Sequence, residues 1–414
     1  MKPSILLRSF PKLIENWWWV QAKQQWPNLG EEKLLNLLRN EIVLQSDRFN
    51  KERSFNASSY GARNLSILAY GNFYFSRTWM AASFSLAEVL VRFKSEFPKK
   101  GPIHILDIGS GSGATGLACL SMLREFGVDN QLHLHALDYS SKSLKYLKSL
   151  HAEGSSLWPD SKITTERSDL AFFSEIRFTR NYDLIVLGYS FNEIAQDLQQ
   201  SDSVDWLDQV SKLLKRQGRI IITEPAESEI CRKLHTVTNT LTEAHEDLFQ
   251  WAPYFNGYSC PLLKKDSKFF SHEVRKYPVI DTTEKINRPL KLEIRDVKFG
   301  FSVLGFGSPA NFENGINIFR IISPVKKRKG TLSFWGIATD NLEYLYEYQR
   351  RDLSKEQMND LLSLERGDLL HITGELFANL NRVRLNKENI IHPIFTPRFA
   401  ISETDCSPTA LLGN

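Results

Sequence analysis

The chain has 414 residues, of which 42% are hydrophobic and 24% charged, an ordinary composition for a folded protein of two or three domains. No run of 18 or more apolar residues occurs, so we expect no membrane-spanning helix. The net charge of +4 is uneven: residues 1–100 hold 15 Lys and Arg against 8 Asp and Glu, and residues 276–330 hold 11 against 5. Two basic segments favour a polyanionic partner, with plain solvated surface as the equally weighted alternative.

The four cysteines, at positions 119, 231, 260 and 406, show no Cys-x-x-Cys pair or regular spacing. This distribution predicts neither a disulfide framework nor a zinc ribbon and favours a reducing compartment. We expect a cytoplasmic protein. The alternative is the mitochondrial matrix, because no acidic residue precedes Glu15 and a short presequence is conceivable.

The first 100 residues are predicted to form a helical region, because segments 31–44 and 83–93 carry apolar residues at helical spacing. From residue 103 short apolar runs alternate with helical stretches. The runs predicted as strands are 103–108, 132–137, 184–187 and 219–223, and the predicted helices are 115–126, 141–151 and 204–215. This alternation predicts an α/β fold with a Rossmann-like parallel sheet over residues 101–250.

A connecting region is expected at residues 251–289, followed by a β-rich domain at 290–400. Its predicted strands are 291–301, 317–322, 331–337, 369–376 and 382–385, and a helix is predicted from Leu342 to Leu364. A small barrel of the oligonucleotide-binding (OB) type would accommodate these elements.

A glycine-rich turn follows the first predicted strand. Asp107 lies near the end of that strand, and Gly109, Gly111 and Gly113 follow it. Glycine is needed where the backbone turns sharply and must approach a ligand closely, and the start of the next helix can hold an anion. Dinucleotide-binding enzymes use a similar turn, so this motif alone does not identify the ligand.

Acidic residues also follow the next two strands. Asp138 ends the run 132–137, where a carboxylate can accept hydrogen bonds from both ribose hydroxyls of a nucleoside ligand. Capping of the next helix is the alternative role for Asp138, although Ser140 or Ser141 would serve equally well. We favour the ribose role, because Asp138 falls where the glycine turn predicts it. For Asp169, contact with an adenine edge and capping of a turn are equally weighted.

The complete pattern resembles class I S-adenosylmethionine-dependent methyltransferases. It consists of the glycine turn, Asp138, the strand beginning at Tyr182 and the strand ending in Glu224-Pro225, and it covers residues 103–225. The resemblance implies S-adenosylmethionine as cofactor, with Asp138 at the ribose. It also implies that the methionine end of the pocket is shaped by Asp107, Gly109, Gly111 and Gly113.

The flanking segments are similar to a narrower family, the methyltransferase-like assembly proteins of the mitochondrial small ribosomal subunit and their bacterial relatives. The shared blocks are Ala69–Thr78, Ala252-Pro253, Cys260-Pro261-Leu262 and the basic block ending in Gly330. This resemblance implies a methyltransferase-fold protein that acts on the small ribosomal subunit or its rRNA. A non-catalytic RNA-binding assembly factor is the first alternative, and a small-molecule methyltransferase is the second.

Many members of that family carry cysteines that are implied to hold an iron–sulfur cluster. The resemblance places Tyr254, Cys260 and Lys268 at three of those positions, and no cysteine lies near residues 335–338. Because a cluster normally needs four thiolates, we expect no iron–sulfur cluster, and we identify no metal site. Tyr254 and the stem of Lys268 are expected to stabilise the loop by packing instead.

The sequence does not identify catalytic residues. Asn192 and Glu193, which follow the strand 182–187, either orient a substrate amine or begin a helix, and the helix is favoured. The Asn/Asp-Pro-Pro-aromatic signature of amino-methylating enzymes is absent, and Cys260-Pro261 reverses the Pro-Cys order of cytosine-C5 enzymes.

Basic residues near the C-terminus are the candidates for RNA phosphate contacts. A run of four lies between Pro324 and Gly330, which favours a projecting turn. It consists of Lys326, Lys327, Arg328 and Lys329, and Arg382 and Arg384 are further candidates.

Overall fold

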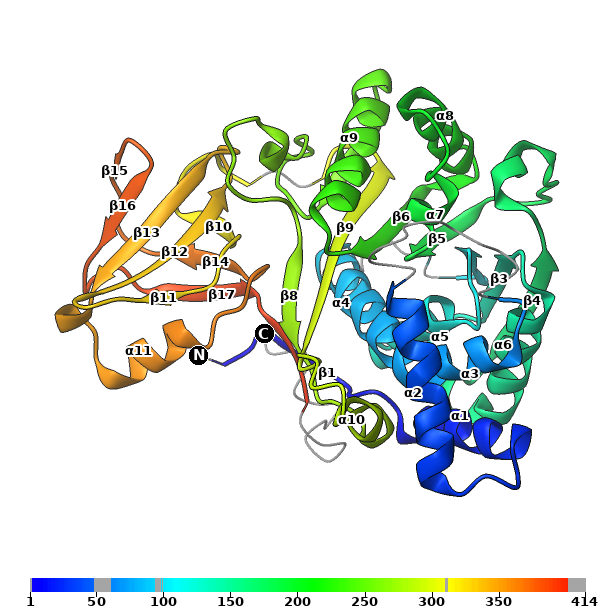
Figure 1. The fold of residues 1–414 in the computed structure, drawn as a ribbon. Helices are drawn as coiled ribbons and strands as arrows, with labels where there is room; N and C mark the ends of the chain where they lie inside the picture. The colour runs from blue at the N-terminus through cyan, green and yellow to red at the C-terminus, as the bar shows by residue number, and fades with distance from the viewer. Residues whose placement is uncertain (1, 48–60, 94–97, 99, 310–311, 401–414) are drawn as a thin grey trace. The chain divides into compact units, whose positions relative to one another are not determined.

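The computed structural model describes residues 2–47, 61–93, 98, 100–309 and 312–400 (Figure 1). The chain forms two compact units that do not follow the order of the sequence. The α/β unit comprises Phe10–Glu224 and Pro278–Arg295, and the β-rich unit comprises Met1–Ser9, Pro225–Tyr277 and Asp296–Asn414. No helix in the described residues is both long and apolar enough to cross a membrane.

The α/β unit begins with four helices and continues with alternating strands and helices, as predicted. The first helices are α1 (Lys12–Gln25), α2 (Glu31–Asp47), α3 (Asn64–Phe73) and α4 (Phe75–Phe93). The alternating part consists of β2 (Ile103–Ile108), α5 (Ala114–Glu125), β3 (Leu132–Asp138), α6 (Ser141–Glu153), β4 (Ser161–Arg167), β5 (Tyr182–Gly188), α7 (Phe191–Ile194), α8 (Gln200–Ser211) and β6 (Leu214–Pro225). A late helix, α10 (Asp281–Asn287), also belongs to this unit.

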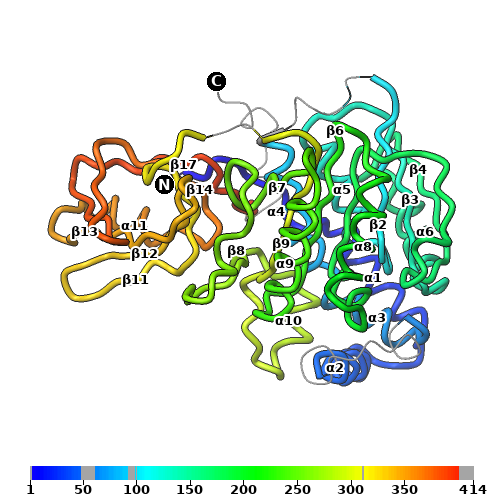
Figure 2. Tube along the Cα trace, turned by 90° about the horizontal axis from the view of Figure 1, so that it is seen from above, coloured from blue at the N-terminus to red at the C-terminus, as the bar shows by residue number. Residues whose placement is uncertain are grey.

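The strands of the α/β unit form a parallel sheet in the order β4-β3-β2-β5-β6. Its central strands are almost continuously apolar and buried, as expected for a parallel sheet covered by helices on both faces. Figure 2 shows α6 beside β3 and β4. The chain order reverses between β2 and β5, and in such sheets ligands bind beyond the carboxyl ends of the strands at this reversal. The Rossmann-like prediction is therefore confirmed.

The N-terminal helices form a core of aromatic side chains. Trp18 is 1% exposed and stacks on Tyr146 of α6 with ring centroids 5.6 Å apart. A Cβ atom at Gly71 would lie 2.1 Å from the Trp18 ring, so only glycine allows α3 to pack this closely against α1.

The β-rich unit contains most of the remaining elements. Outside the barrel these are β1 (Ile5–Leu7), α9 (Ser228–Ala244), β7 (Leu248–Ala252), β8 (Glu273–Lys276), β9 (Asp296–Phe306) and β18 (Pro397–Phe399). The barrel consists of β10 (Ile318–Ile321), β11 (Lys326–Lys327), β12 (Thr331–Ala338), β13 (Glu343–Gln349), α11 (Lys355–Leu362), β14 (Leu369–Ile372), β15 (Ala378–Asn379), β16 (Arg382–Leu385) and β17 (Ile391–Phe395).

The strand connections of the barrel match those of the OB fold. β10 pairs antiparallel with both β12 and β14, β12 pairs with β13, and α11 lies between β13 and β14 in the sequence. The last strand is split: β16 pairs parallel with β13, and β17 pairs antiparallel with β14. This is the five-stranded Greek-key arrangement expected of an OB-type barrel.

The prediction of a helix at residues 342–364 was wrong over most of that range. Residues 343–349 form strand β13, and helix α11 spans only Lys355–Leu362. In β13 the buried side chains alternate, and Tyr344, Tyr346 and Tyr348 point into the barrel core. A period of two is typical of a half-buried strand. Tyr346 stacks on Phe319 with ring centroids 4.1 Å apart, so this face of β13 is the one that faces the barrel core.

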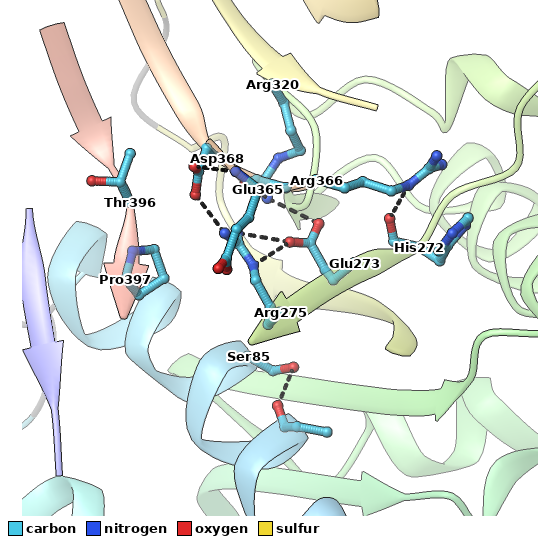
Figure 3. A network of polar contacts seen from close by, with 12 residues as sticks. Ser85, His272, Glu273, Arg275, Arg320, Glu365, Arg366, Asp368, Thr396 and Pro397 are labelled. Carbon is cyan, nitrogen blue, oxygen red and sulfur yellow. Dashed lines mark hydrogen bonds and ion pairs between the residues drawn. The ribbon is translucent and has the colours of Figure 1, made fainter. Parts of the chain in front are cut away.

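A buried network of charges lies beside the barrel in the β-rich unit (Figure 3). Arg275, 1% exposed, donates to Glu273 at 2.8 Å and to Asp368 at 2.5 Å. Arg398 also contacts Asp368, at 2.7 Å, and Arg320 contacts Glu273 at 3.3 Å. Because each buried carboxylate has two cationic partners, the cost of removing these charges from water is offset.

Candidate cofactor site

The glycine turn after β2 has the geometry that its sequence predicts. Gly109, Gly111 and Gly113 have φ values of 73°, 52° and 94°, in the left-handed region that favours glycine. A Cβ at Gly109 would lie 2.4 Å from the Cβ of Ser190, and one at Gly113 would lie 2.3 Å from Leu147. A Cβ at Gly111 would meet nothing within 4 Å. The turn therefore packs tightly at two glycines and leaves open space at the third.

Polar atoms without partners surround this turn. Within the described residues, the buried hydroxyls of Ser110 and Ser112 and one carboxyl oxygen of Asp107 make no hydrogen bond. The other Asp107 oxygen accepts from the Gly116 N–H at 2.9 Å, and burial raises the pKa of Asp107 to about 7. Buried polar groups are normally satisfied, so these atoms fit a ligand that carries its own polar groups, such as the ammonium and carboxylate of a methionine moiety.

Asp138 lies at the end of β3 and contacts the glycine turn directly. Its Oδ2 accepts from the Gly111 N–H at 2.8 Å and its Oδ1 from the Ser140 N–H at 2.7 Å. Burial raises the pKa of Asp138 to about 6, although both N–H bonds oppose the rise. Ser140 caps α6 by accepting from the Ser143 N–H. Asp138 is therefore free of the capping role and keeps acceptor capacity for ribose hydroxyls.

Asp169 is placed differently. Its side chain is exposed and accepts from the Ala171 N–H at 3.1 Å, which caps the short 3-10 helix that follows. Of the two roles open to this residue, the structure shows the capping contact.

The segment after β5 borders the glycine turn, since the Ser190 hydroxyl donates to the carbonyl of Ile108 at 2.7 Å. Tyr189 has a φ of 60°, a conformation that costs a non-glycine residue of order 1 kcal/mol or more and that is common at functional sites. Helix α7 follows and carries Asn192 and Glu193, so the predicted helix start is confirmed. The Asn192 Oδ1 is buried and has no partner within the described residues.

Glu224 at the end of β6 holds this segment in place. Its carboxyl is fully buried and accepts the backbone N–H of Asn192 at 3.2 Å and that of Phe191. Burial raises the pKa of Glu224 well above its ordinary value, and nearby Glu193 raises it further. Glu224 is therefore a positioning residue for the segment that bears Asn192 and Glu193.

Glu193 and Tyr70 complete the set of titratable groups. Burial and the nearby charge of Asp138 raise the pKa of Glu193 to about 8. Tyr70 on α3 is close enough to Glu193, Asp107 and Asp138 for each to raise its pKa, after the larger effect of burial. Both Glu193 and Tyr70 keep some accessible surface, so they border space that solvent can enter.

Sequence reasoning missed Tyr70 and the role of Glu224. Glu224 could have been noticed in the sequence, because it ends an apolar strand and a buried carboxyl is costly unless it has partners. Tyr70 left none, since it lies in a separate helix more than 30 residues before the glycine turn.

The loop compared above with a cluster-binding loop is a packed core in the β-rich unit. Tyr254 and Cys260 are buried together with Leu262, and burial raises the pKa of the Cys260 thiol to about 11. The packing role of Tyr254 is confirmed, whereas Lys268 is exposed and the packing of its stem stays a prediction. In the described part of the chain no three His, Cys, Asp or Glu side chains are arranged to hold a metal ion. That the protein lacks a cluster stays a prediction.

The four basic residues lie at an exposed β-hairpin in the β-rich unit. Lys326 and Lys327 form β11, which pairs with β12, and Arg328 exchanges two backbone hydrogen bonds with Thr331. Gly330, with a φ of 85°, closes the turn. The side chains of all four basic residues are exposed.

Comparison with known proteins gives one match to a family model: the methyltransferase domain, over residues 106–220. No curated protein sequence shows significant similarity to the chain. Similar solved structures include a protein of Listeria monocytogenes described as a class I S-adenosylmethionine-dependent methyltransferase, with 13% identity over 73% of this chain and 88% of that one, and a TM-score of 0.37.

Two further structures are similar over a smaller share. TrmN from Thermus thermophilus has 15% identity over 56% of this chain and 52% of its own, with a TM-score of 0.30. The mitomycin 7-O-methyltransferase MmcR has 16% identity and a TM-score of 0.29, and the match spans about half of each chain, 51%. From the family match, the sheet order and the glycine turn, we conclude that residues 106–220 form a methyltransferase domain of the class I S-adenosylmethionine-dependent fold.

Proposed function

We propose that this protein is a cytoplasmic S-adenosylmethionine-dependent methyltransferase that acts on the small ribosomal subunit or its RNA. The observation that carries the proposal is the pairing of a methyltransferase domain with an exposed run of four cations, Lys326–Lys329, on a separate barrel. The four side-chain charges of such a run repel one another, whereas a polyanion such as RNA would neutralise them.

The cofactor site supports binding of a cationic nucleoside. Asp138, at the end of β3, would accept hydrogen bonds from the ribose hydroxyls, and the unpartnered hydroxyls of Ser110 and Ser112 would serve the methionine end. Asp107, Asp138 and Glu193 are carboxyl groups that a cationic ligand would favour in their ionised, negatively charged forms. When bound, S-adenosylmethionine supplies a methyl group on a positively charged sulfur, and transfer needs little more than alignment with a nucleophile in a desolvated site.

Asn192 and Glu193 are the candidates for handling the acceptor. The carboxyl of Glu224 holds the backbone N–H groups of Phe191 and Asn192, so the turn that carries Asn192 and Glu193 is preorganised. Burial raises the pKa of Glu193 to about 8, so its ionised form is a stronger base than an ordinary carboxylate. A bound cationic cofactor would favour that ionised form, which would then take a proton from an acceptor group.

The test is transfer of a radiolabelled methyl group from S-adenosylmethionine to immature small subunits purified from cells that lack the protein. We expect labelled rRNA with the wild type and a rate at least tenfold lower with Glu193→Gln, since loss of a general base costs about 10²–10⁴-fold. Label in neither RNA nor protein of the subunit would contradict the enzymatic proposal.

A non-catalytic RNA-binding platform is the second candidate. It is favoured by the location of the basic hairpin, because the β-rich unit that carries it does not contain the cofactor site. Co-sedimentation of the protein with small subunits without methyl transfer would support the platform. Absence of both would leave the small-molecule methyltransferase.

A further inference from the structure

Hydrogen bonds at two points hold the chain segment 61–85 near the carboxyl ends of β3 and β6. Gly61, ahead of α3, accepts from the hydroxyl of Ser140, which follows β3, at 2.5 Å. Ser85 of α4 accepts from the hydroxyl of Thr223, near the end of β6, at 3.3 Å. The cofactor site described above lies at these same strand ends. The residues between Gly61 and Ser85 therefore run past the site.

The helical backbone continues from α3 into α4 without a break. Tyr74 lies between the two helices in a right-handed helical conformation. Its N–H donates to the Tyr70 carbonyl at 2.8 Å, and its carbonyl accepts from the Thr78 N–H at 3.0 Å. Residues three and four apart on a helix are neighbours on one face. Tyr70, Tyr74 and Arg77 therefore form a row about 10 Å long, and all three keep some accessible surface.

The row leads outward from the cofactor site. Burial raises the pKa of Tyr70, and three carboxyls of the cofactor site raise it further, so Tyr70 lies at the inner end. Its hydroxyl donates to the Thr78 hydroxyl at 3.1 Å. Burial also raises the pKa of Tyr74, but the other groups that act on it are Arg77 and Ser46, which lies near the end of α2. Arg77 is therefore at the outer end of the row.

Arg77 carries a charge that the described part of the chain does not compensate. Its side chain is half-buried, yet it forms no hydrogen bond or ion pair with any other described residue. Removing a charge partly from water is costly unless an anion or an acceptor offsets the loss. Phosphate is an anion that a guanidinium group binds well, because two N–H groups can donate to two of its oxygens.

The two tyrosine rings lie next to this charge. The ring centroids of Tyr70 and Tyr74 are 6.2 Å apart, and their planes differ by 30°. Nucleobases bind against aromatic rings whatever their sequence. Enzymes that modify a base take it out of its stack and hold it against side chains of this kind. The row thus offers rings for a base and a cation for its phosphate, over about the length of one nucleotide.

We propose that Tyr70, Tyr74 and Arg77 form the acceptor subsite, and that it holds one unstacked nucleotide of RNA. The phosphate binds Arg77, and the base contacts the two rings at the end of the row that borders the cofactor site. A lysine or arginine side chain of a protein acceptor would be repelled by Arg77. This inference rests on the proposed function and adds to it the form in which the acceptor binds.

The experiment measures kcat/KM for methyl transfer to immature small subunits from cells that lack the protein, and cofactor affinity by calorimetry. Arg77→Ala should lower kcat/KM at least about tenfold, the lower end for a lost hydrogen bond to a charged group. The melting temperature and the affinity for S-adenosylmethionine should stay unchanged. Arg77→Lys should restore part of the activity, because a point charge still attracts phosphate.

Lys33→Ala is the control for the loss of one positive charge. Lys33 is exposed and lies on α2, about 20 Å along the helix from Ser46. This variant should methylate the subunits as the wild type does.

The rings are tested at Tyr74. Tyr74→Leu should lower kcat/KM at least about fivefold, the lower end of the cost of one lost base stack. Tyr74→Phe keeps the ring and should recover most of that loss. Equal losses in the two variants would show that the ring does not hold a base.

Salt dependence identifies the phosphate contact. One contact to single-stranded RNA contributes about 0.7 to the slope of log affinity against log salt. The slope of log kcat/KM against log salt should be shallower by about that amount for Arg77→Ala and unchanged for Lys33→Ala. A lowered melting temperature with an unchanged slope would assign Arg77 to folding and overturn the proposal.

The remaining outcomes separate this inference from the proposed function. Weaker binding of S-adenosylmethionine by Arg77→Ala would mean that the guanidinium holds the carboxylate of the cofactor, which overturns the subsite. An unchanged kcat/KM, or label in protein rather than RNA of the subunit, overturns the subsite and leaves an active methyltransferase. If the wild type transfers no methyl group, the proposed function fails and this inference fails with it.

Discussion

Four carboxyl groups lie at or just after the carboxyl ends of the parallel strands β2, β3, β5 and β6: Asp107, Asp138, Glu193 and Glu224. Burial raises the pKa of each, so without a cation nearby they hold protons that ordinary carboxyls release. Loss of solvation is the larger effect, and mutual repulsion adds to it. A ligand with a positive sulfur and an ammonium group would reverse both effects and stabilise the ionised forms.

Cofactor affinity should therefore depend on pH. A positively charged ligand lowers the pKa values of about 6 and 8 at Asp138 and Glu193, so protons leave on binding. Raising the pH removes those protons in advance, and affinity for S-adenosylmethionine should rise between about pH 6 and pH 8, by up to tenfold per pH unit for each proton released.

Isothermal titration calorimetry in two buffers with different ionisation enthalpies measures this proton release directly. S-adenosylhomocysteine, which lacks the positive sulfur, should show a shallower dependence, and Glu193→Gln should flatten its upper part. Equal affinity for S-adenosylmethionine at pH 6 and pH 8 would show that the carboxyls do not face the ligand.

Among individual residues, the sequence predicted the glycine turn and Asp138. The turn directly follows a predicted strand and Asp138 ends the next one, so both can be located from local sequence alone. The Asp138 contact with Gly111 spans only 27 residues. Tyr70 and Glu224 could not be assigned in the same way, because their place depends on how α3 and β6 pack in three dimensions.

Among the elements, β13 shows where sequence patterns mislead. The segment after residue 342 is rich in residues that suit a helix, yet its tyrosines alternate with polar residues at a period of two. Core packing decided the outcome, because Tyr346 stacks on Phe319 and Phe334. The pairing of Lys326 with Ser333 follows from the register of two strands, which the sequence of a single strand does not reveal.

Replacing Tyr346 with alanine should destabilise the protein by about 3–5 kcal/mol, the range for deleting a buried aromatic ring. The neighbouring Glu347→Ala should change stability by no more than about 0.5 kcal/mol, because its side chain points outward. Urea unfolding compares the two variants. Equal losses would mean that residues 343–349 do not form the strand described above.

The basic hairpin can be tested through the salt dependence of RNA binding. Each phosphate contact to single-stranded RNA contributes about 0.7 to the slope of log affinity against log salt. Replacing residues 326–329 with alanine should flatten that slope by up to about 2–3 units and leave the melting temperature nearly unchanged. Filter binding to small-subunit RNA across a salt series measures the slope, and an unchanged slope would assign the run to solvated surface.

At the scale of the whole molecule, the first and the last described strands of the chain pair with each other. β1 pairs parallel with β18, and both strands belong to the β-rich unit, although the residues that follow β1 belong to the α/β unit. The domains were predicted as consecutive ranges of residues, because a change of composition along the sequence reports only on neighbouring residues. A pairing across more than 390 residues leaves no local trace.

Leu7 reports on this pairing, because it is fully buried and opposite Phe399. Leu7→Ala should cost about 2–5 kcal/mol of stability, as for other buried leucines. Leu6→Ala, at a half-buried site on the same strand, is the control and should cost less. Thermal unfolding followed by circular dichroism compares them, and an unchanged midpoint for Leu7→Ala would mean that β1 is not part of the folded core.

The central claim is that the glycine turn and Asp138 form an S-adenosylmethionine site, and calorimetric titration of the purified protein with that cofactor tests it most directly. We predict binding by the wild type and a loss of about 1.5–3 kcal/mol in Asp138→Ala, the range for hydrogen bonds to a charged group. Asp169→Ala removes an exposed capping carboxylate and should bind as the wild type does. Absence of both heat and a thermal shift with the wild-type protein would contradict the account.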